Sequence, residues 1–382
     1  MMRYEDSVEL FVGESKMQVQ ELFSDERFPN VVVSTEGTVI ATWGKNTFRL
    51  RRSEDGGDTW GPEIEVADPG FHGGGATVDE ANETVIVFAE KEHPPKTPRT
   101  EMGPLKVFRS ADDGTTWERV EAVIHPDPNG FVPSRHMAEH GIALRHGEHA
   151  GRLIRPARVY NKAGAEPARY CCAIYSDDGG DEWFSSEPFP EPGTGESALI
   201  ELSDGRIYCT ARKSDFDTQP DDYHFHRPVA WSHDGGKTWE GLELEKTLPD
   251  GPRYRSEKAS NACYNGHFGL FAGLTRLPVE GRDVLLYSNA DTPGDERIRG
   301  TVWASFDGGD TWPIKRLVHD GPFAYSSLNA GRPGTPSEGW IYLQFEGGEN
   351  HCYDGGLIAR FNLSWLLEGE ATGEGELPEW VR

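Results

Sequence analysis

Ser53-Glu-Asp55-Gly-Gly57-Asp-Thr-Trp60 is the first of five copies of one eight-residue motif in this chain. Each copy keeps a Ser, an Asp, a Gly and a Trp at the same offsets, and the later copies begin at Ser110, Ser176, Ser232 and Ser305. A motif that recurs at such intervals indicates a repeat architecture. The Asp can accept hydrogen bonds from the amides of its own turn, and Gly tolerates the positive φ that a tight reversal needs. We therefore expect each copy to be a turn between two strands, with its Trp ring packed against the neighbouring unit and its indole N–H bonded to a partner.

The segments between the copies alternate short β-rich runs with turns, and helical periodicity is almost absent. Runs such as 30–34, 38–43 and 84–88 are typical of strands. The spacing predicts six units of four strands, a fifth beginning near Ala262 and a sixth without the motif. A strand near 7–12 is expected to pair with the last unit, because closing the ring removes exposed strand edges.

Composition narrows the possible partners. The 382 residues carry a net charge of −26, which argues against nucleic acid, since phosphate binding needs a basic surface. No apolar run reaches the length of a membrane span. The N-terminus lacks the apolar core of a signal peptide, so the compartment stays open between the cytoplasm and export with a removed signal. Five Cys in no metal-binding pattern predict neither a disulfide framework nor a metal site, and no cofactor is expected.

The repeated motif resembles the Asp-box, the turn between the third and fourth strands of each blade in sialidase-type β-propellers. The resemblance covers nearly the whole chain and implies an all-β fold, a six-bladed β-propeller (sialidase-like) with five Asp-box turns. Residues 1–370 would form this single domain, and 371–382 would be a loose C-terminal tail. In such propellers the Asp-boxes lie on the face opposite the active site, so the funnel residues are sought at the other end of each unit.

Several stretches at that end resemble sialidase motifs and imply site residues. Glu26-Arg27-Phe28-Pro29 is similar to the Arg-Ile-Pro motif, and the segments from Gly195, Arg297, Gly321 and Leu343 resemble other family segments. By this resemblance, a sialic-acid carboxylate would be bound by an Arg triad, namely Arg27, Arg212 and Arg297 (or Arg299, one strand period further on). The nucleophile would be Tyr325, its base Glu196, and the residue that orients the first arginine Glu346.

These residue types suit the chemistry. Three guanidinium groups can hold a carboxylate through charge-assisted hydrogen bonds. An Asp or Glu nucleophile would be repelled by the carboxylate beside the anomeric carbon, whereas a Tyr is neutral until a base takes its proton. The sequence thus favours a sialidase-like exo-glycosidase that hydrolyses a terminal anionic sugar, with carbohydrate as its partner.

The resemblance fails after the first unit's second strand. Where sialidases usually have an Arg followed by an acidic proton donor, this chain has Lys45 and no Asp or Glu before Glu54. Proton donation contributes roughly a hundred- to ten-thousand-fold, so a substitute is needed. The candidates from neighbouring loops are His72, Glu139 and His140, with Lys45 and His136 as further substrate-binding residues.

Two other readings stay open. The first is another enzyme class on the same frame, either a uronate-cleaving polysaccharide lyase or a glycosidase for a different sugar. It would use His72, His136 or His140 with Tyr325, and the missing acidic residue favours it. The second is a carbohydrate-binding propeller without turnover, because fold alone does not imply catalysis.

Overall fold

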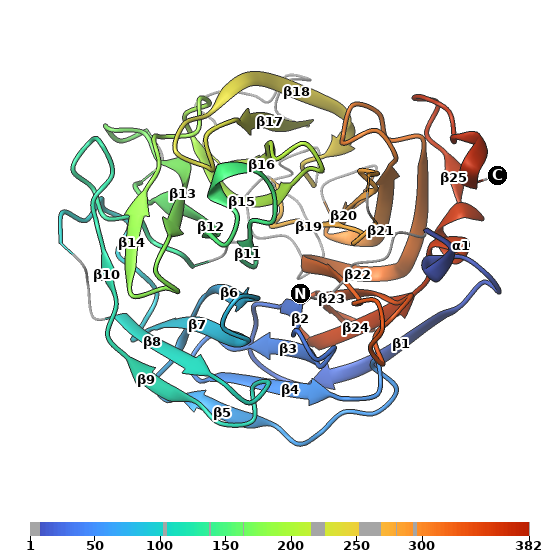
Figure 1. Ribbon diagram of the computed structural model, residues 1–382, viewed down its shortest axis with the longest axis horizontal. Helices are drawn as coiled ribbons and strands as arrows, with labels where there is room; N and C mark the ends of the chain where they lie inside the picture. The colour runs from blue at the N-terminus through green and yellow to red at the C-terminus, as the bar shows by residue number, and fades with distance from the viewer. Residues whose placement is uncertain are drawn as a thin grey trace.

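The computed structural model describes residues 8–101, 105–136, 139–162, 164–214, 226–251, 269–279, 281–292 and 296–381. Within these ranges the chain is built of strands in sheets that follow one another around a common centre (Figure 1). The helical segments there are short: α1 (Leu363–Leu367), η1 (Val8–Phe11), η2 (Gly147–His149) and η4 (Glu379–Val381). The all-β class expected from the turn spacing is confirmed.

Three sheets have four antiparallel strands each, ordered from the centre outwards as in the chain (Figure 1). The first contains β2 (Asn30–Val33), β3 (Val39–Trp43), β4 (Phe48–Ser53) and β5 (Ile64–Ala67). The second contains β6 (Phe71–Asp79), β7 (Thr84–Glu90), β8 (Leu105–Ser110) and β9 (Glu118–Val120). The third contains β15 (Thr194–Glu201), β16 (Ile207–Lys213), β17 (His226–Ser232) and β18 (Glu240–Pro249).

A fourth sheet has five strands, because a short parallel strand joins its outer edge. Its members are β11 (Ile142–Ala143), β12 (Leu153–Val159), β13 (Tyr170–Ser176), β14 (Glu182–Ser185) and the added β10 (Val123–Ile124).

The last sheet has eight strands and is organised by the 17-residue strand β22 (Ile314–Ala330). The first half of β22 pairs with β21 and the second half with β23, so the sheet divides into two parts. Its other members are β19 (Gly273–Arg276), β20 (Leu285–Ala290), β21 (Ile298–Ser305), β23 (Ile341–Gly347), β24 (Gly355–Phe361), β1 (Met17–Phe23) and β25 (Glu370–Ala371). Ala262, where the fifth unit was expected to begin, lies outside the described residues.

Contacts between sheets run around the centre and return to their start. β2 contacts β6, β6 contacts β11 and β12, and β12 contacts β15. β15 then contacts β19, β19 contacts β22, and β22 contacts β2. The central strands therefore pack side by side, and every residue of β2, β6 and β15 is buried. Strands buried on both faces read as continuous apolar or small-residue runs, which is why Val31–Val33 lacks polar alternation.

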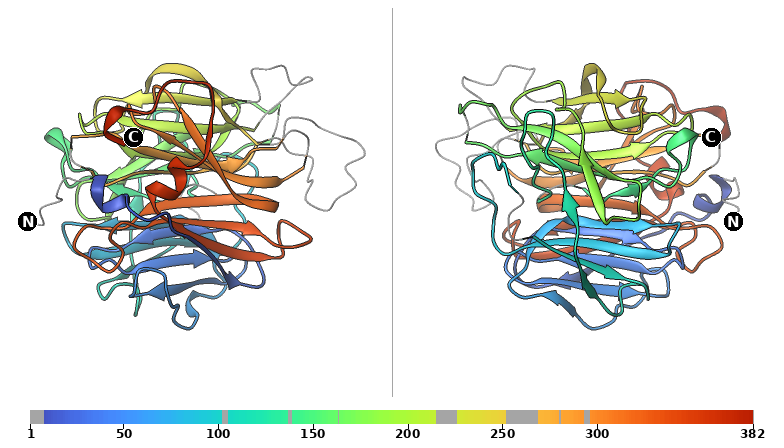
Figure 2. Two further views of the ribbon diagram at one scale, coloured as in Figure 1. Left: turned by 90° about the vertical axis from the view of Figure 1, so that its right-hand side faces the viewer. Right: turned by 60° about the vertical axis from the view of Figure 1, so that its left-hand side comes forward.

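An N-terminal strand pairs with the last sheet, as expected, but it begins later in the chain than the sequence suggested. The strand that pairs with β24 is β1, with Met17 opposite Phe361 and Val19 opposite Ala359. The expected location at 7–12 is wrong, since Val8–Phe11 forms η1, with Val8 and Phe11 buried in the core (Ser7 lies outside the described residues). In both views of Figure 2, η1, α1 and η4 lie on the same side of the molecule.

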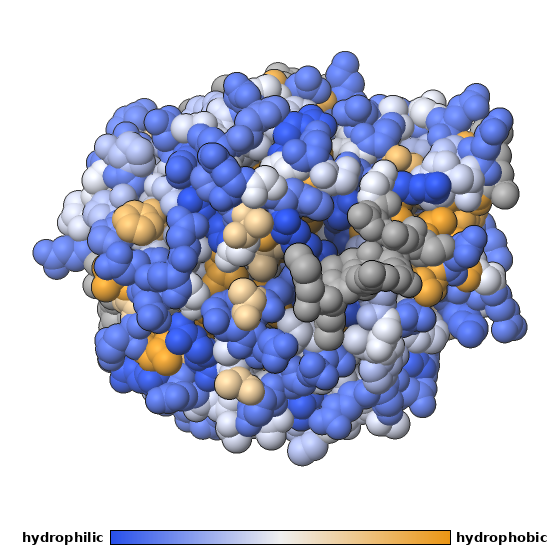
Figure 3. Space-filling view, viewed as in Figure 1, coloured by the Kyte–Doolittle hydropathy of each residue, from blue (hydrophilic) through white to orange (hydrophobic). Residues whose placement is uncertain are grey.

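Residues after the last long strand contact the sheet that contains β22. Ala371 pairs with Ile314, and the ring of Trp380 packs against Phe306 with ring centroids 5.8 Å apart. The surface seen in Figure 3 is mainly hydrophilic, in keeping with the high charge of the chain.

The repeated motif forms the expected turn between the third and fourth strands of a sheet. In the first copy, the Ser53 hydroxyl donates to Asp55 Oδ1 at 2.8 Å and accepts from the Gly57 amide at 2.8 Å. The Thr59 amide also donates to Asp55 Oδ1, and equivalent bonds recur in the other four copies. Gly57 has φ +84°, which an L side chain rarely adopts, so Gly is required there.

The motif's Trp residues pack as expected, and only some satisfy their N–H group. Trp183 packs against Phe88 of the preceding sheet, with ring centroids 5.4 Å apart, and donates to the Gly180 carbonyl at 2.9 Å. The indole nitrogens of Trp60 and Trp312 have no hydrogen-bond partner among the described residues, so our expectation of a partner for every copy is wrong. Apolar packing is thus the shared role of these Trp side chains.

Candidate active site

A cavity of about 270 Å³ lies at the beginnings of the central strands, the end remote from the Asp-box turns. Residues from all five sheets and their loops line it: Arg27, Phe28, Lys45, Phe71, His93, Lys96, Arg158, Tyr160, Arg169, Glu196, Arg212, Ser214 and Tyr325. Arg27 precedes β2, Phe71 begins β6 and Glu196 lies near the start of β15. The ring of sheets therefore brings residues that are far apart in the sequence to one mouth.

A buried Tyr–Glu–Arg group forms one wall of this cavity. The Tyr325 hydroxyl donates to Glu196 Oε1 at 3.2 Å, and Arg212 Nη1 donates to Glu196 Oε2 at 2.5 Å. Arg212 Nη1 also lies 3.2 Å from the Tyr325 hydroxyl oxygen. The carboxylate thus contacts both the phenol and a guanidinium, and it can take a proton from the first while the second stabilises its charge.

The charges around this group set its protonation. Burial acts to raise the pKa of Glu196, but Arg212 and Arg158 outweigh it and lower that pKa to about 2. Burial and the Glu196 carboxylate raise the pKa of the Tyr325 phenol, opposed by Arg212, Arg297 and Arg27. At neutral pH the resting pair is an ionised carboxylate and a protonated phenol, the state from which a base can remove the phenolic proton.

Arg27 is held rigidly by Glu346. Its Nε and Nη2 atoms each donate to one carboxylate oxygen of Glu346 at 2.9 Å, and the backbone amides of Phe28 and Tyr325 donate to the same carboxylate. Glu346 is fully buried, and the side chain of Arg27 is 20% exposed. Glu26 and Phe28 on either side have φ values of 61° and 81°, an uncommon conformation for residues with side chains. The backbone thus turns sharply to direct this guanidinium into the mouth.

Arg297 lies behind Tyr325, and its neighbour Tyr353 was not expected from the sequence. The Arg297 guanidinium carbon is 5.6 Å from the Tyr325 ring centroid, and its Nη1 donates to the Tyr353 hydroxyl at 2.6 Å. Nη2 of Arg297 is buried and has no hydrogen-bond partner among the described residues. Arg299, the alternative, forms an ion pair with Asp320 at the surface. The guanidinium carbon of Arg27 lies 3.7 Å from the centroid of the Tyr353 ring, so this one aromatic side chain contacts both arginines.

The three residues that the sequence suggested as proton donors are buried in the interior and do not line the cavity. His72 is buried, and its Nε2 bonds to the Thr42 hydroxyl at 2.9 Å while its Nδ1 accepts from the Gly74 and Gly75 amides. Burial, with Arg155 nearby, lowers its pKa to about 3, so the ring is neutral.

Glu139 and His140 are also in the interior. Glu139 accepts from the Ser327 hydroxyl, the Leu328 amide and Asn30 Nδ2, and burial raises its pKa well above the usual range. His140 bonds to the carbonyl of Leu328 at 3.0 Å and faces the opposite end of the strands. These two residues and His72 do not line the cavity that contains Tyr325.

The two further substrate-binding candidates differ in position. Lys45 lines the cavity, on a loop whose Lys45, Asn46 and Thr47 amides all donate to the Glu26 carboxylate. His136 is fully buried and bonds to the Ser134 hydroxyl and to Arg158 Nη2 at 2.5 Å. It therefore supports a cavity residue and does not itself line the wall.

Sequence reasoning missed several lining residues, among them Arg158, Tyr160, Arg169, His93 and Lys96. None lies in a stretch with a family motif. Only their position in the repeat could have predicted them: His93 and Tyr160 follow β7 and β12, the second strands of their units, just as Lys45 follows β3.

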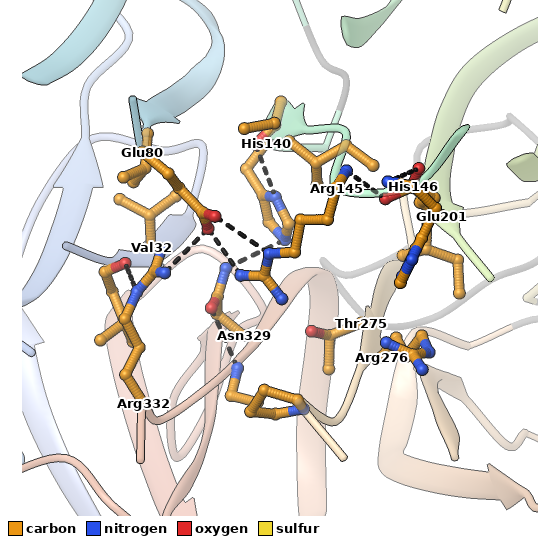
Figure 4. A pocket seen from close by; sticks show the side chains of 18 residues that line it. Val32, Glu80, His140, Arg145, His146, Glu201, Thr275, Arg276, Asn329 and Arg332 are labelled. Carbon is orange, nitrogen blue, oxygen red and sulfur yellow. Dashed lines mark hydrogen bonds and ion pairs between the residues drawn. The ribbon is translucent and has the colours of Figure 1, made fainter. Parts of the chain in front are cut away.

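A second cavity, of about 110 Å³, opens at the other end of the central strands (Figure 4). Glu80 lies there between Arg145 and Arg332 and bonds to both, at 2.6 Å and 2.8 Å. Glu201 accepts from the backbone amides of Arg145 and His146. Glu80 and Glu201 therefore hold the loop after β11 against the ring.

The described residues form neither a cluster of metal ligands nor a membrane-spanning helix. Among the described residues, no three His, Cys, Asp or Glu side chains are grouped so as to hold a metal ion. No helix in the same ranges is long and apolar enough to cross a bilayer.

Known proteins resemble this chain over most of its length. A family model described as "BNR repeat-like domain" matches residues 44–335. A sialidase from Micromonospora viridifaciens is 32% identical over 376 residues, covering 91% of this chain and 53% of the relative. The chain thus spans about half the length of that relative.

Solved structures share the fold at lower identity. The Hadza microbial sialidase Hz136 superposes with a TM-score of 0.64 at 22% identity, over 89% of this chain and 66% of that one. The intramolecular trans-sialidase from Ruminococcus gnavus, in complex with oseltamivir carboxylate, also gives 0.64, at 17% identity, over 90% of this chain and 95% of that one. Because the family model extends from the loop after β3 past the end of β22, the chain belongs to the BNR repeat-like family of the sialidase superfamily.

Proposed function

We propose that this protein is a sialidase-like exo-glycosidase that removes a terminal anionic sugar of the sialic acid type from a carbohydrate. The observation that carries the proposal is the hydrogen bond from the Tyr325 hydroxyl to Glu196 in the wall of the cavity. A phenol paired with a carboxylate base is the nucleophile suited to a sugar whose anomeric carbon carries a carboxylate. The proposal includes the frame, a six-bladed β-propeller over residues 1–370, with 371–382 as its tail.

Three arginines would bind the substrate carboxylate. Arg27 and Arg212 line the cavity, and the unpartnered Nη2 of Arg297 supplies a further donor beside the Tyr325 ring. Glu346 would keep Arg27 in place through its two parallel hydrogen bonds. Fixed donors of this kind bind a carboxylate without first having to be ordered.

The reaction would proceed in two displacements. As Glu196 takes the phenolic proton, the Tyr325 oxygen bonds to the anomeric carbon, and the leaving oxygen departs with the electrons of the broken bond, as a phenolate from an aryl sialoside. Water then attacks the same carbon and gives one proton to the solvent, which balances the anionic leaving group; the bond from the carbon to the Tyr325 oxygen breaks, and the proton on Glu196 returns to that oxygen. The anomeric configuration is retained, as two inversions require.

The test is release of a fluorescent phenol from an aryl sialoside by the purified chain. We expect turnover in the wild type, and a loss of at least about a hundredfold in kcat/KM for Tyr325→Phe, which keeps the ring but lacks the nucleophilic oxygen. Tyr175→Phe is the matched control, because it makes the same change at a tyrosine on β13 that does not line this cavity. Full activity in Tyr325→Phe would refute the assignment, and an unsaturated uronate product from a polyuronate would favour a lyase instead.

A further inference from the structure

The cavity is far more cationic than the chain that forms it. The net charge of the chain is −26, yet six lining residues are cationic: Arg27, Lys45, Lys96, Arg158, Arg169 and Arg212. Among the described lining residues the only carboxylate is Glu196. Concentrated positive charge in a concave site of an acidic protein attracts anions locally.

Part of this positive charge lies apart from the proposed carboxylate clamp. Arg27 is neutralised by Glu346, and Arg212 by Glu196. Lys96 lies on the loop after β7, Arg158 near the end of β12, and Arg169 immediately before β13. This second group therefore comes from the second and third units along the chain.

Two arginines of this group share one aromatic ring. The guanidinium carbons of Arg158 and Arg169 lie 4.5 Å and 5.2 Å from the centroid of Tyr160. Contact with an aromatic face stabilises a cation and fixes its position. Because both guanidinium groups contact one ring, they lie close enough to donate to the same anionic group of a ligand.

Arg158 is also anchored from below. It is 2% exposed, its Nη2 contacts His136 Nε2 at 2.5 Å, and its Nη1 lies 3.6 Å from Glu196 Oε1. Glu196 already binds Arg212, so one carboxylate lies beside two guanidinium groups. The Arg158 guanidinium is thus fixed in the buried wall of the cavity.

We propose that Lys96, Arg158 and Arg169, arranged around Tyr160, form a second anion-binding subsite that takes a sulfate ester or a second carboxylate of the substrate. The preferred substrate is then doubly anionic, with one group on the Arg27 side and the other on this subsite. This inference rests on the proposed function for its substrate, but the subsite itself can be tested separately.

The kinetic test compares singly and doubly anionic substrates in the full chain. The substrates are a plain sialyl-galactoside, the same compound with a sulfate ester on the sialic-acid side chain, and one with the sulfate on the galactose. We expect one sulfated compound to exceed the plain one in kcat/KM by about tenfold, the size of one charge-assisted contact, and which one does so locates the second anion. Equal rates for all three would overturn the proposal.

Variants assign that preference to the subsite. Lys96→Gln and Arg169→Gln should each lower the sulfated-to-plain ratio of kcat/KM by about tenfold. Lys91→Gln, on the same loop but outside the cavity, should leave the ratio unchanged. A fall in both rates that preserves the ratio would contradict a specific role.

Direct titration with inorganic sulfate separates this proposal from the catalytic one. If no sialoside is cleaved, the proposed function fails, and calorimetry with sulfate still decides on the subsite. Weakened sulfate binding in Arg169→Gln but not in Arg297→Gln supports it. Binding that depends on Arg297 alone, or no binding in the wild type, contradicts it.

Discussion

At the scale of single residues, the charge around Glu196 determines what the site can do. Arg212 and Arg158 lower its pKa to about 2 against burial, so it is ionised throughout the physiological range. An ionised carboxylate can accept the phenolic proton of Tyr325 but cannot donate one to a leaving oxygen. Glu196 can therefore serve as the base of the proposed mechanism, but the acid that protonates the leaving oxygen must be another group.

A site with a base but without an acid predicts that kcat/KM depends steeply on the leaving group. Among the described residues that line the cavity, Glu196 is the only carboxylate, and because it is ionised it cannot protonate the leaving oxygen. We expect aryl sialosides, whose phenols leave without a proton, to exceed sialyl-galactosides by at least about a hundredfold in kcat/KM. A series of phenols of graded pKa measures this slope, and a flat series would mean that an efficient donor acts in the site.

At the scale of elements, the Asp-box turns connect the outer strands of each sheet. Asp307 accepts from the Ser305 hydroxyl at 2.7 Å, the Thr311 amide at 2.9 Å and the Thr311 hydroxyl at 2.6 Å. Removing its carboxylate leaves these donors without their acceptor while the turn persists.

We therefore expect Asp307→Ala to lower the free energy of unfolding by about 1–3 kcal/mol, the usual cost of several lost hydrogen bonds at a turn. Urea denaturation followed by tryptophan fluorescence measures it. Asp310→Ala in the same turn is the matched control, because both aspartates are exposed but the hydrogen bonds of the turn go to the Asp307 carboxylate. Equal effects of both substitutions would show that the turn does not depend on Asp307.

Elements were the part of the structure that the sequence predicted best. The motif located the third-to-fourth strand turns, because its Ser, Asp and Gly have a local geometry that distant residues do not alter. The site was predicted less completely. His72 and Glu139 lie close to the starts of strands in the sequence, which made them candidates for the cavity wall. In the structure their side chains are buried in the interior, and no local sequence pattern predicts that burial. Arg158 and Tyr353 belong to the site because they contact residues of other sheets. A single sequence does not predict such contacts where no family motif is present.

At the scale of the whole molecule, acidic residues from distant segments meet on the outside of the ring. Glu245 on β18 lies near Glu374 of the C-terminal segment, whose carboxylate binds the Thr247 hydroxyl. Burial, with Glu374, Glu243 and Asp307 nearby, raises the pKa of Glu245 to about 7, against the lowering effect of the Thr247 amide. A carboxyl with a raised pKa favours the folded state when protonated, so this stability is present below about pH 4.5 and is lost as the pH rises through 7.

Glu245→Gln should therefore raise the free energy of unfolding at pH 8 by about 1–2 kcal/mol, discounted for partial solvent screening, and change it little at pH 4.5. Denaturation midpoints at the two pH values measure the difference. Glu121→Gln, an exposed carboxylate elsewhere, removes the same charge and should show no such pH dependence. A stabilisation of equal size at both pH values would contradict the assignment to Glu245.

The most direct test of the central claim is to identify the residue that bonds to the sugar. A fluorinated sialosyl donor slows the second displacement, so the glycosyl-enzyme accumulates and can be digested and analysed by mass spectrometry. The account predicts one added sugar on the peptide that contains Tyr325, and no adduct in Tyr325→Phe. An adduct on another side chain, or steady turnover of the donor by Tyr325→Phe, would contradict it.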